Sequence, residues 1–268
     1  PVGTPPNAIA VGTLADAGYN VSFLQWMIVA VPIMVVLLFG AWWMLGRFYR
    51  GSSDRIEIDI DATFDRSTPA MIFYVTFAVT VLLWLTEPIH GISSSIVGFL
   101  PVVILLATRV FTTRDMQSIQ WNVLWLVAGG IALGIGVGTS GLDDWLVSRI
   151  NWDVIDPAMI IVVLALIAVA LSTVISNSAA TNLLMPIGLS LAVSGGLGLN
   201  PILVAFFIAI AASSALALPV STPPNAIAYS TGAVTTKSMA LTGVAVGAAS
   251  LLLFFLIAPT IWGMLGVS

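Results

Sequence analysis

The stretch GTPPNAIAVGT (residues 3–13) returns near the other end of the chain as STPPNAIAYST (residues 221–231). Extending both copies back to residues 1 and 219 gives ten identities over thirteen aligned positions, at an offset of 218 residues. Two consecutive prolines remove two backbone donors and cannot continue a preceding helix. Each copy therefore predicts a break between helices. Because the sequence is repeated, we expect the two breaks to have the same role.

The composition identifies the solvent around these breaks. Hydrophobic residues make up 59% of the 268 residues and charged residues 7%, whereas about a quarter of an ordinary soluble domain is charged. Since roughly 20 apolar residues span a bilayer as a helix, the sequence predicts an all-α polytopic membrane protein. The expected spans cover residues 23–45, 70–86, 92–108, part of 116–142, and 239–264.

The central part of the C-terminal half is an uncharged segment that does not fit a single membrane span. Residues 157–236 form a run of 80 positions without Asp, Glu, Lys, Arg or His. This run is too long for one helix, and glycine, proline and serine interrupt it. We expect residues 157–194 to form a re-entrant hairpin with its tip in STVISNSAATN (172–182). Residues 201–232 should form a helix that is broken at the second TPPN copy, with the span before the break over residues 201–218.

The basic residues orient the chain, because cytoplasmic loops carry an excess of Lys and Arg. With the linker 47–67 inside, seven of the eight basic residues are cytoplasmic and only Arg149 lies outside. The two TPPN copies then run in opposite directions, and an inverted repeat with broken helices is typical of secondary transporters. Residue 1 is a proline inside a motif, so we expect the segment before it to be missing. The expected parts are the end of an N-terminal repeat (1–20), a transmembrane helix with a cytoplasmic linker (21–68), and a C-terminal repeat (69–268).

The polar residues at the broken places predict what they bind. Irregular backbone at membrane depth is tolerated only where protein covers it or where it lines a wet cavity. Unwinding near residues 219–221 frees carbonyls for a cation, while the helix that starts near Asn225 turns its positive N-terminus toward an anion. Thr222 and Asn225 add a hydroxyl and an amide; an ordinary turn is the alternative. The hairpin tip adds five polar side chains, for which helix capping alone is the alternative: Ser172, Ser176, Asn177, Ser178 and Asn182.

The spanning segments contain no internal Asp, Glu, Lys or Arg. Proton-coupled carriers usually keep a titratable group inside the membrane, so Na⁺ held by carbonyl and hydroxyl oxygens is the favoured co-transported ion. An intramembrane enzyme would need a nucleophile with a base, paired aspartates or metal ligands. We therefore predict that the protein is not an enzyme. A non-transporting membrane subunit would not need two unwound helices.

The motifs resemble those of the divalent anion/sodium symporters, the DASS family of dicarboxylate, citrate and sulfate carriers. ISNSAATNLLMPI is similar to that family's second Ser-Asn-Thr hairpin motif, and PVSTPPNAIAYSTG and PVGTPPNAIAVG are similar to its two broken-helix loops. The resemblance covers essentially the whole chain. It departs from the family at Ser178, where the family usually has Thr, and the first hairpin motif is absent from these residues. The departure at Ser178 leaves the identity of the anion open.

The resemblance implies two sodium sites with one substrate between them, in a homodimer of the inner (cytoplasmic) membrane that moves as an elevator and has no nucleic-acid partner. The second sodium site would consist of Ser172, Ile175, Asn177 and Ser221, and Gly3 would belong to the first. The substrate would meet Asn177, Ser178, Thr222, Pro223, Thr4 and Pro5, together with Asn225 from the argument above. We expect a sodium symporter of C4-dicarboxylates such as succinate or malate. A carrier of sulfate or citrate, or a proton-coupled exchanger, is the alternative.

Overall fold

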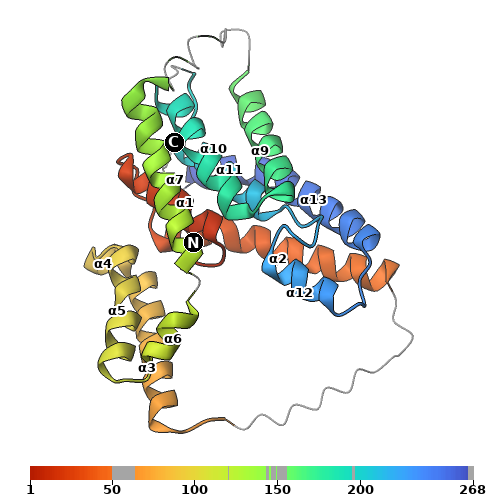
Figure 1. Cartoon of the computed structure of the whole chain (residues 1–268). Helices are drawn as coiled ribbons and strands as arrows, with labels where there is room; N and C mark the ends of the chain where they lie inside the picture. Colours follow the sequence, from red (N-terminus) through yellow and green to blue (C-terminus); the bar gives the residue numbers. More distant parts are fainter. Residues whose placement is uncertain are drawn as a thin grey trace. The chain divides into compact units, whose positions relative to one another are not determined.

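The described part of the chain is largely helical (Figure 1). The computed structural model describes residues 1–49, 64–119, 121–142, 145, 149, 156–194 and 197–264, and within these ranges it has no β-strand. The helices are α1 (Pro5–Asp16), α2 (Phe23–Phe48), α3 (Thr68–Leu85), α4 (Glu87–His90), α5 (Ser94–Ala107), α6 (Thr113–Ser118), α7 (Trp121–Ser140), α9 (Pro157–Val174), α10 (Asn177–Ser194), α11 (Pro201–Ser213), α12 (Pro223–Ser230) and α13 (Thr236–Met264).

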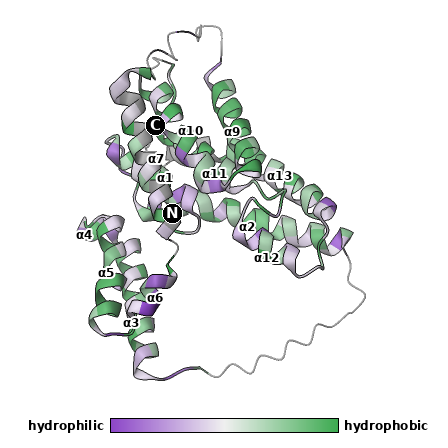
Figure 2. Ribbon diagram, in the orientation of Figure 1, coloured by the Kyte–Doolittle hydropathy of each residue, from purple (hydrophilic) through white to green (hydrophobic). Residues whose placement is uncertain are grey.

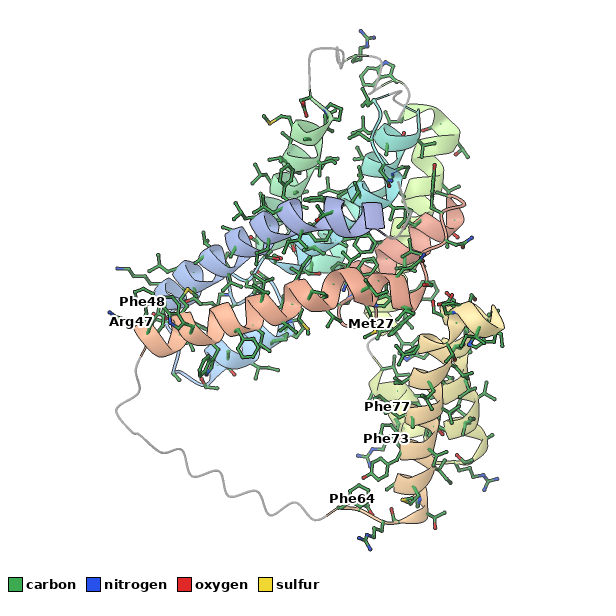
Figure 3. The ribbon with its side chains drawn as sticks, turned by 180° about the vertical axis from the view of Figure 1, so that it is seen from behind. Met27, Arg47, Phe48, Phe64, Phe73 and Phe77 are labelled. Atoms are coloured by element: carbon green, nitrogen blue, oxygen red, sulfur yellow. The ribbon has the colours of Figure 1, made fainter. Side chains whose placement is uncertain are left out.

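Four of the described helices are long and apolar enough to cross a membrane, namely α2, α3, α9 and the part of α13 from Thr236 to Ile257. The apolar residues cover these helices almost all the way round (Figure 2), as expected where lipid replaces water. Along α3, for example, Phe73 and Phe77 are both exposed and their rings stack 6.4 Å apart (Figure 3). The helices confirm the predicted all-α, multi-pass membrane protein.

The described helices form two compact units. One comprises Pro1–Val21, Val29–Trp42 and Trp121–Ser268, and the other Ser22–Ile28 and Trp43–Gln120. Helix α2 contributes to both, so this division cuts across the expected parts 1–20, 21–68 and 69–268. Both TPPN copies and the hairpin belong to the first unit. Most of the predicted cytoplasmic linker, residues 50–63, lies outside the described residues.

The second unit is organised around the turn between α3 and α5. The carboxylate of Glu87 accepts a hydrogen bond of 3.0 Å from the backbone N–H of Phe23, at the start of α2. The Phe23 ring stacks on Trp84 at 4.9 Å, and Trp84 Nε1 donates to the Ser94 carbonyl at 3.0 Å. Both ring nitrogens of His90 bond to backbone groups. The single histidine of the chain therefore holds this turn together.

Helix α11 is the centre of the first unit. It packs against α1, α9, α10 and α13, and nine of its residues are buried. On α10, Gly188 allows a close approach, because a Cβ there would lie 2.5 Å from Cδ1 of Ile208 on α11. On the α13 side, the rings of Phe207 and Phe254 meet edge to face at 4.6 Å. Dense packing of this kind fixes the position of the end of α11.

Helices α9 and α10 pack against each other and cover the predicted segment 157–194, with only Ile175 and Ser176 between them. The predicted span over 201–218 is wrong at its end. Helix α11 stops at Ser213, and the unwound segment covers residues 214–222. The two prolines occupy the first two positions of α12, where a missing N–H costs nothing. The break therefore precedes the prolines instead of lying at them.

Candidate functional site

Three other elements of the first unit meet the end of α11, which we define as Ala212, Ser213 and Ser214. The carbonyl of the first residue accepts a hydrogen bond of 2.7 Å from Ser172 Oγ of the hairpin. The hydroxyl oxygen of the second lies 2.9 Å from Thr4 Oγ1 of the first TPPN copy. The hydroxyl oxygen of the third lies 2.8 Å from Ser250 Oγ of α13. These consecutive residues join the hairpin, the first TPPN copy and α13 at one place.

The hairpin contributes an oxygen-rich cluster. Ser172 Oγ lies 2.6 Å from Asn177 Oδ1 as well as 2.7 Å from the Ala212 carbonyl. Ser172 is fully buried and Asn177 is 9% exposed. A serine hydroxyl has one proton, so it cannot satisfy both acceptors at once. The cluster therefore holds three oxygens and one donor, an arrangement that suits a cation.

Two neighbouring serines at the start of α10 have different roles. Ser176 caps the helix, since its Oγ accepts a hydrogen bond of 3.2 Å from the backbone N–H of Ala179. Ser178 is half-buried in the first turn, and its hydroxyl makes no hydrogen bond with any described residue. The Nδ2 group of Asn177 is equally without a partner among these residues. The first turn of α10 thus offers a hydroxyl and an amide to a ligand.

The unwound segment is held by Asn225. Its Nδ2 group donates to the carbonyls of Leu216 at 3.0 Å and Leu218 at 3.1 Å, so both amide protons are used. A direct contact of Asn225 with the substrate stays a prediction. Ser221 Oγ donates to the Thr173 carbonyl at 3.2 Å, which ties the segment to the hairpin. The carbonyls of residues 219–221 accept no hydrogen bond from the described part of the chain and are free to bind a cation.

The same contacts gather the starts of three helices. Thr222 caps α12 by accepting from the Asn225 N–H at 3.3 Å, and Pro223 follows as the first helical residue. Thr4 and Pro5 occupy the same positions in α1. Helix N-termini each carry about half a positive charge, and residues 157–236 contain no Asp or Glu to offset them. The starts of α1, α10 and α12 therefore favour an anion near the end of α11.

The predicted residues differ in how directly they join this arrangement. Ser172, Asn177, Ser221 and Thr4 are linked to it by hydrogen bonds of their side chains. Ile175 ends α9 in the turn of the hairpin. Gly3 is exposed next to Thr4, and no described residue hydrogen-bonds to its carbonyl. The described residues also contain no group of three His, Asp or Glu that could hold a metal ion, so a cation here would meet neutral oxygens.

Sequence reasoning missed several residues of this arrangement: Thr173, Ala212, Ser213, Ser214 and Ser250. The signal for Ser213 and Ser214 was weak, because a pair of serines near the end of an apolar helix is common. The signal for Ser250 was its spacing from two glycines on α13. Gly243, Gly247 and Ser250 lie four and three residues apart, which places small residues on one helix face.

Comparison with known proteins identifies the family. Residues 2–268 match the family described as the sodium:sulfate symporter transmembrane region. The chain is similar to the sodium-dependent dicarboxylate transporter SdcS of Staphylococcus saprophyticus, with 30% identity over 97% of this chain and 56% of the relative. It is also similar to SdcS of Staphylococcus aureus strain USA300, with 29% identity over 96% of this chain and 54% of the relative. The chain thus spans about half the length of these relatives. Because the family match covers nearly every residue, the protein belongs to the sodium:sulfate symporter family, the divalent anion/sodium symporters that its motifs resemble.

Proposed function

We propose that the protein is a sodium-coupled symporter of small divalent anions, with C4-dicarboxylates such as succinate or malate as its substrates. The observation that carries this proposal is the arrangement at the hairpin tip. Asn177 turns its oxygen toward the Ser172 cluster and leaves its Nδ2 group without a partner among the described residues. One amide side chain therefore offers an acceptor to a cation and a donor to an anion.

The oxygen cluster supports sodium as the coupling ion. Ser172 Oγ, Asn177 Oδ1 and the Ala212 carbonyl form a buried group with one proton between two acceptors. The carbonyls of residues 219–221 and of Ile175 accept no hydrogen bond from the described residues, and they belong to the two segments that the bond from Ser221 to Thr173 joins. A sodium ion would satisfy these acceptors, which have no donor in the described part of the chain. Half-helix ends and unwound carbonyls bind Na⁺ in other secondary transporters.

The donors at the three helix starts support a dianion as the substrate. Asn177 Nδ2 and the Ser178 hydroxyl are available on α10. Thr222 Oγ1 accepts from the Asn225 N–H, so its own proton is free to donate to a ligand. Two carboxylate groups could each be met by such donors, while the helix N-termini and the bound sodium compensate their charge.

The same arrangement explains how sodium binding would be coupled to binding of the anion. A sodium ion near Asn177 Oδ1 would fix the rotation of the amide and thereby aim Nδ2 at the substrate. Without the ion, Oδ1 has only the Ser172 proton, which it shares with the Ala212 carbonyl. The substrate would then lose an oriented donor. We infer that sodium binds first and raises the affinity for the anion.

The comparisons support the substrate class to different degrees. The names of the relatives specify dicarboxylates, and the family description specifies sulfate. Both are small dianions, so the general chemistry of the site fits either. We favour dicarboxylates because the names of these relatives specify the substrate of individual proteins, whereas the family description covers the group as a whole. The carrier would work as a homodimer in the cytoplasmic membrane by an elevator motion, as the family resemblance implies.

The test is uptake of radiolabelled succinate by the full-length protein in proteoliposomes. An inward sodium gradient is expected to drive uptake, and choline in place of sodium should abolish it. Asn177→Ala should abolish uptake as well, since a hydrogen bond to a charged ligand contributes about 1.5–3 kcal/mol. Asn20→Ala, in an exposed loop, is the control and should behave as wild type. Equal uptake in choline would refute sodium coupling, and competition by sulfate but not by malate would refute the dicarboxylate.

A further inference from the structure

Helix α13 lies against the backbone at which α11 breaks. The hydroxyl oxygens of Ser250 and Ser214 are 2.8 Å apart, and the two residues are 3% and 9% exposed. One turn earlier on α13, a Cβ at Gly247 would lie 2.8 Å from the Ser214 carbonyl oxygen. A Cβ at Gly243 would come closer still to the Leu216 carbonyl. The first residues of the unwound segment therefore run directly along α13.

The Leu216 carbonyl is fixed from two sides. It accepts a hydrogen bond of 3.0 Å from Asn225 Nδ2 and also lies against the backbone of α13 at Gly243. Asn225 holds the Leu218 carbonyl in the same way. The carbonyls of Leu216 and Leu218 are therefore in contact with Asn225 or α13. The carbonyls of residues 219–221, in contrast, accept no hydrogen bond from the described residues. Contacts with α13 thus help to decide which carbonyls of the break stay open.

We propose that Ser250 is a positioning residue for the cation site: it fixes Ser214 at the start of the unwound segment and so sets the path of the open carbonyls. Ser250 itself touches neither the ion nor the substrate. This inference rests on the proposed function, because it assigns those carbonyls to sodium. The reason for a hydroxyl at position 250 is that it accepts a hydrogen bond of 2.8 Å from Ser214 Oγ. Ser214 Oγ also donates to the Ile210 carbonyl at 2.7 Å, so its single proton is shared between α13 and the last turn of α11.

The experiment measures succinate uptake by the full-length protein in proteoliposomes as a function of sodium concentration. Ser250→Ala should raise the half-saturating sodium concentration about three- to tenfold, the range expected for the loss of one hydrogen bond. Ser250→Thr keeps the hydroxyl and should restore sodium dependence close to wild type. Gly247→Ala should have a larger effect than Ser250→Ala, because its Cβ would collide with the Ser214 carbonyl.

The control is Gly40→Ala on α2, where a Cβ meets nothing within 4 Å, and its sodium dependence should equal that of wild type. A lowered melting temperature of Ser250→Ala with unchanged sodium dependence would overturn the inference, since packing alone predicts that result. If Gly247→Ala does not fold, the two Ser250 variants decide the question.

Failure of the proposed function can be recognised separately. If the wild-type protein takes up succinate equally well in choline, sodium coupling is refuted, and the positioning role is judged by thiol labelling instead. Val220 is 65% exposed in the unwound segment, so Val220→Cys reports on its path. Ser250→Ala should change the labelling rate of this cysteine. An unchanged rate would overturn the positioning role.

Discussion

Thr4 and Thr222 begin the two TPPN copies with nearly the same backbone conformation. Their φ and ψ angles are −145° and 149° in the first copy, and −144° and 151° in the second. Their side chains have different partners, however. Thr222 caps its own helix, whereas Thr4 makes no capping hydrogen bond and instead reaches Ser213 Oγ on α11. The local turn is the same in both copies, and the surroundings determine what the hydroxyl does.

Asn7 and Asn225, which occupy equivalent positions in the two copies, also have different partners. Asn225 holds the segment before it through two carbonyls, those of Leu216 and Leu218. Asn7 occupies the equivalent position in the first copy, and its Oδ1 is buried without a hydrogen-bond partner among the described residues. The helices that follow also differ, because α1 buries four residues and α12 buries none. The first copy is held by packing of its helix, and the second by hydrogen bonds of its loop.

The largest expected difference is between Asn225→Ala and Asn7→Ala. The first change removes the described donor of the Leu216 carbonyl, at a cost of about 1–3 kcal/mol, whereas the Leu218 carbonyl keeps a hydrogen bond of 3.2 Å from the Ser221 N–H. The second removes an acceptor that has no described partner and should cost little. Thermal unfolding of the two purified full-length variants measures both effects. Equal losses of stability would show that Asn7 has a partner beyond the described residues, and that the two loops are held alike.

A smaller effect separates the threonines. A double-mutant cycle of Thr4→Val with Ser213→Ala should give a coupling energy of about 0.5–1.5 kcal/mol, the contribution of one hydrogen bond. The matched cycle of Thr222→Val with Ser213→Ala should give none, because Thr222 bonds within its own helix. Denaturant unfolding provides the free energies. Coupling in both cycles would mean that the two hydroxyls share a partner, contrary to this account.

The smallest expected effect is that of replacing the proline that begins the helix in each copy. Pro5 and Pro223 both occupy the first position of a helix, where proline stabilises mainly by restricting the unfolded chain. Pro5→Ala and Pro223→Ala should therefore each lower the free energy of unfolding by about 0.4–1 kcal/mol, and by similar amounts. A large loss for one of them alone would show that its ring has a tertiary role that the local turn does not explain.

The sequence was sufficient to predict helix ends that are set by nearby residues. The hairpin over residues 157–194 followed from an uncharged run with capping residues in its middle, and its bounds match α9 and α10. The start of α12 followed from Pro223 and Pro224. The end of α11 was placed five residues too late, since residues 214–218 (SALAL) contain no proline or glycine that would signal a break. That break depends on Asn225, which lies after the prolines and bonds back to the carbonyls of Leu216 and Leu218, and on contacts with α13.

Some contacts among the candidate site residues were predictable, and their binding roles stay predictions. Ser172, Asn177 and Ser221 were named from the motifs, and the structure links their side chains to the hairpin or to α11. Ser213, Ser214 and Ser250 were not predicted, because a serine in an apolar helix often bonds only to a carbonyl of its own preceding turn. Their roles depend on which helices become neighbours, and sequence periodicity does not report that.

The most direct test of the proposed site compares two serines that are two residues apart. Ser178 has a hydroxyl without a described partner, while Ser176 caps α10. Succinate affinity and melting temperature are to be measured on the same purified full-length protein. Ser178→Ala is predicted to weaken succinate binding by about 1–3 kcal/mol at an unchanged melting temperature, and Ser178→Thr to keep it. Ser176→Ala should lower the melting temperature, by the loss of a cap that contributes about 0.5–2 kcal/mol. Normal succinate affinity with a lowered melting temperature in Ser178→Ala would contradict the account, because it would make Ser178 a structural residue instead of a ligand.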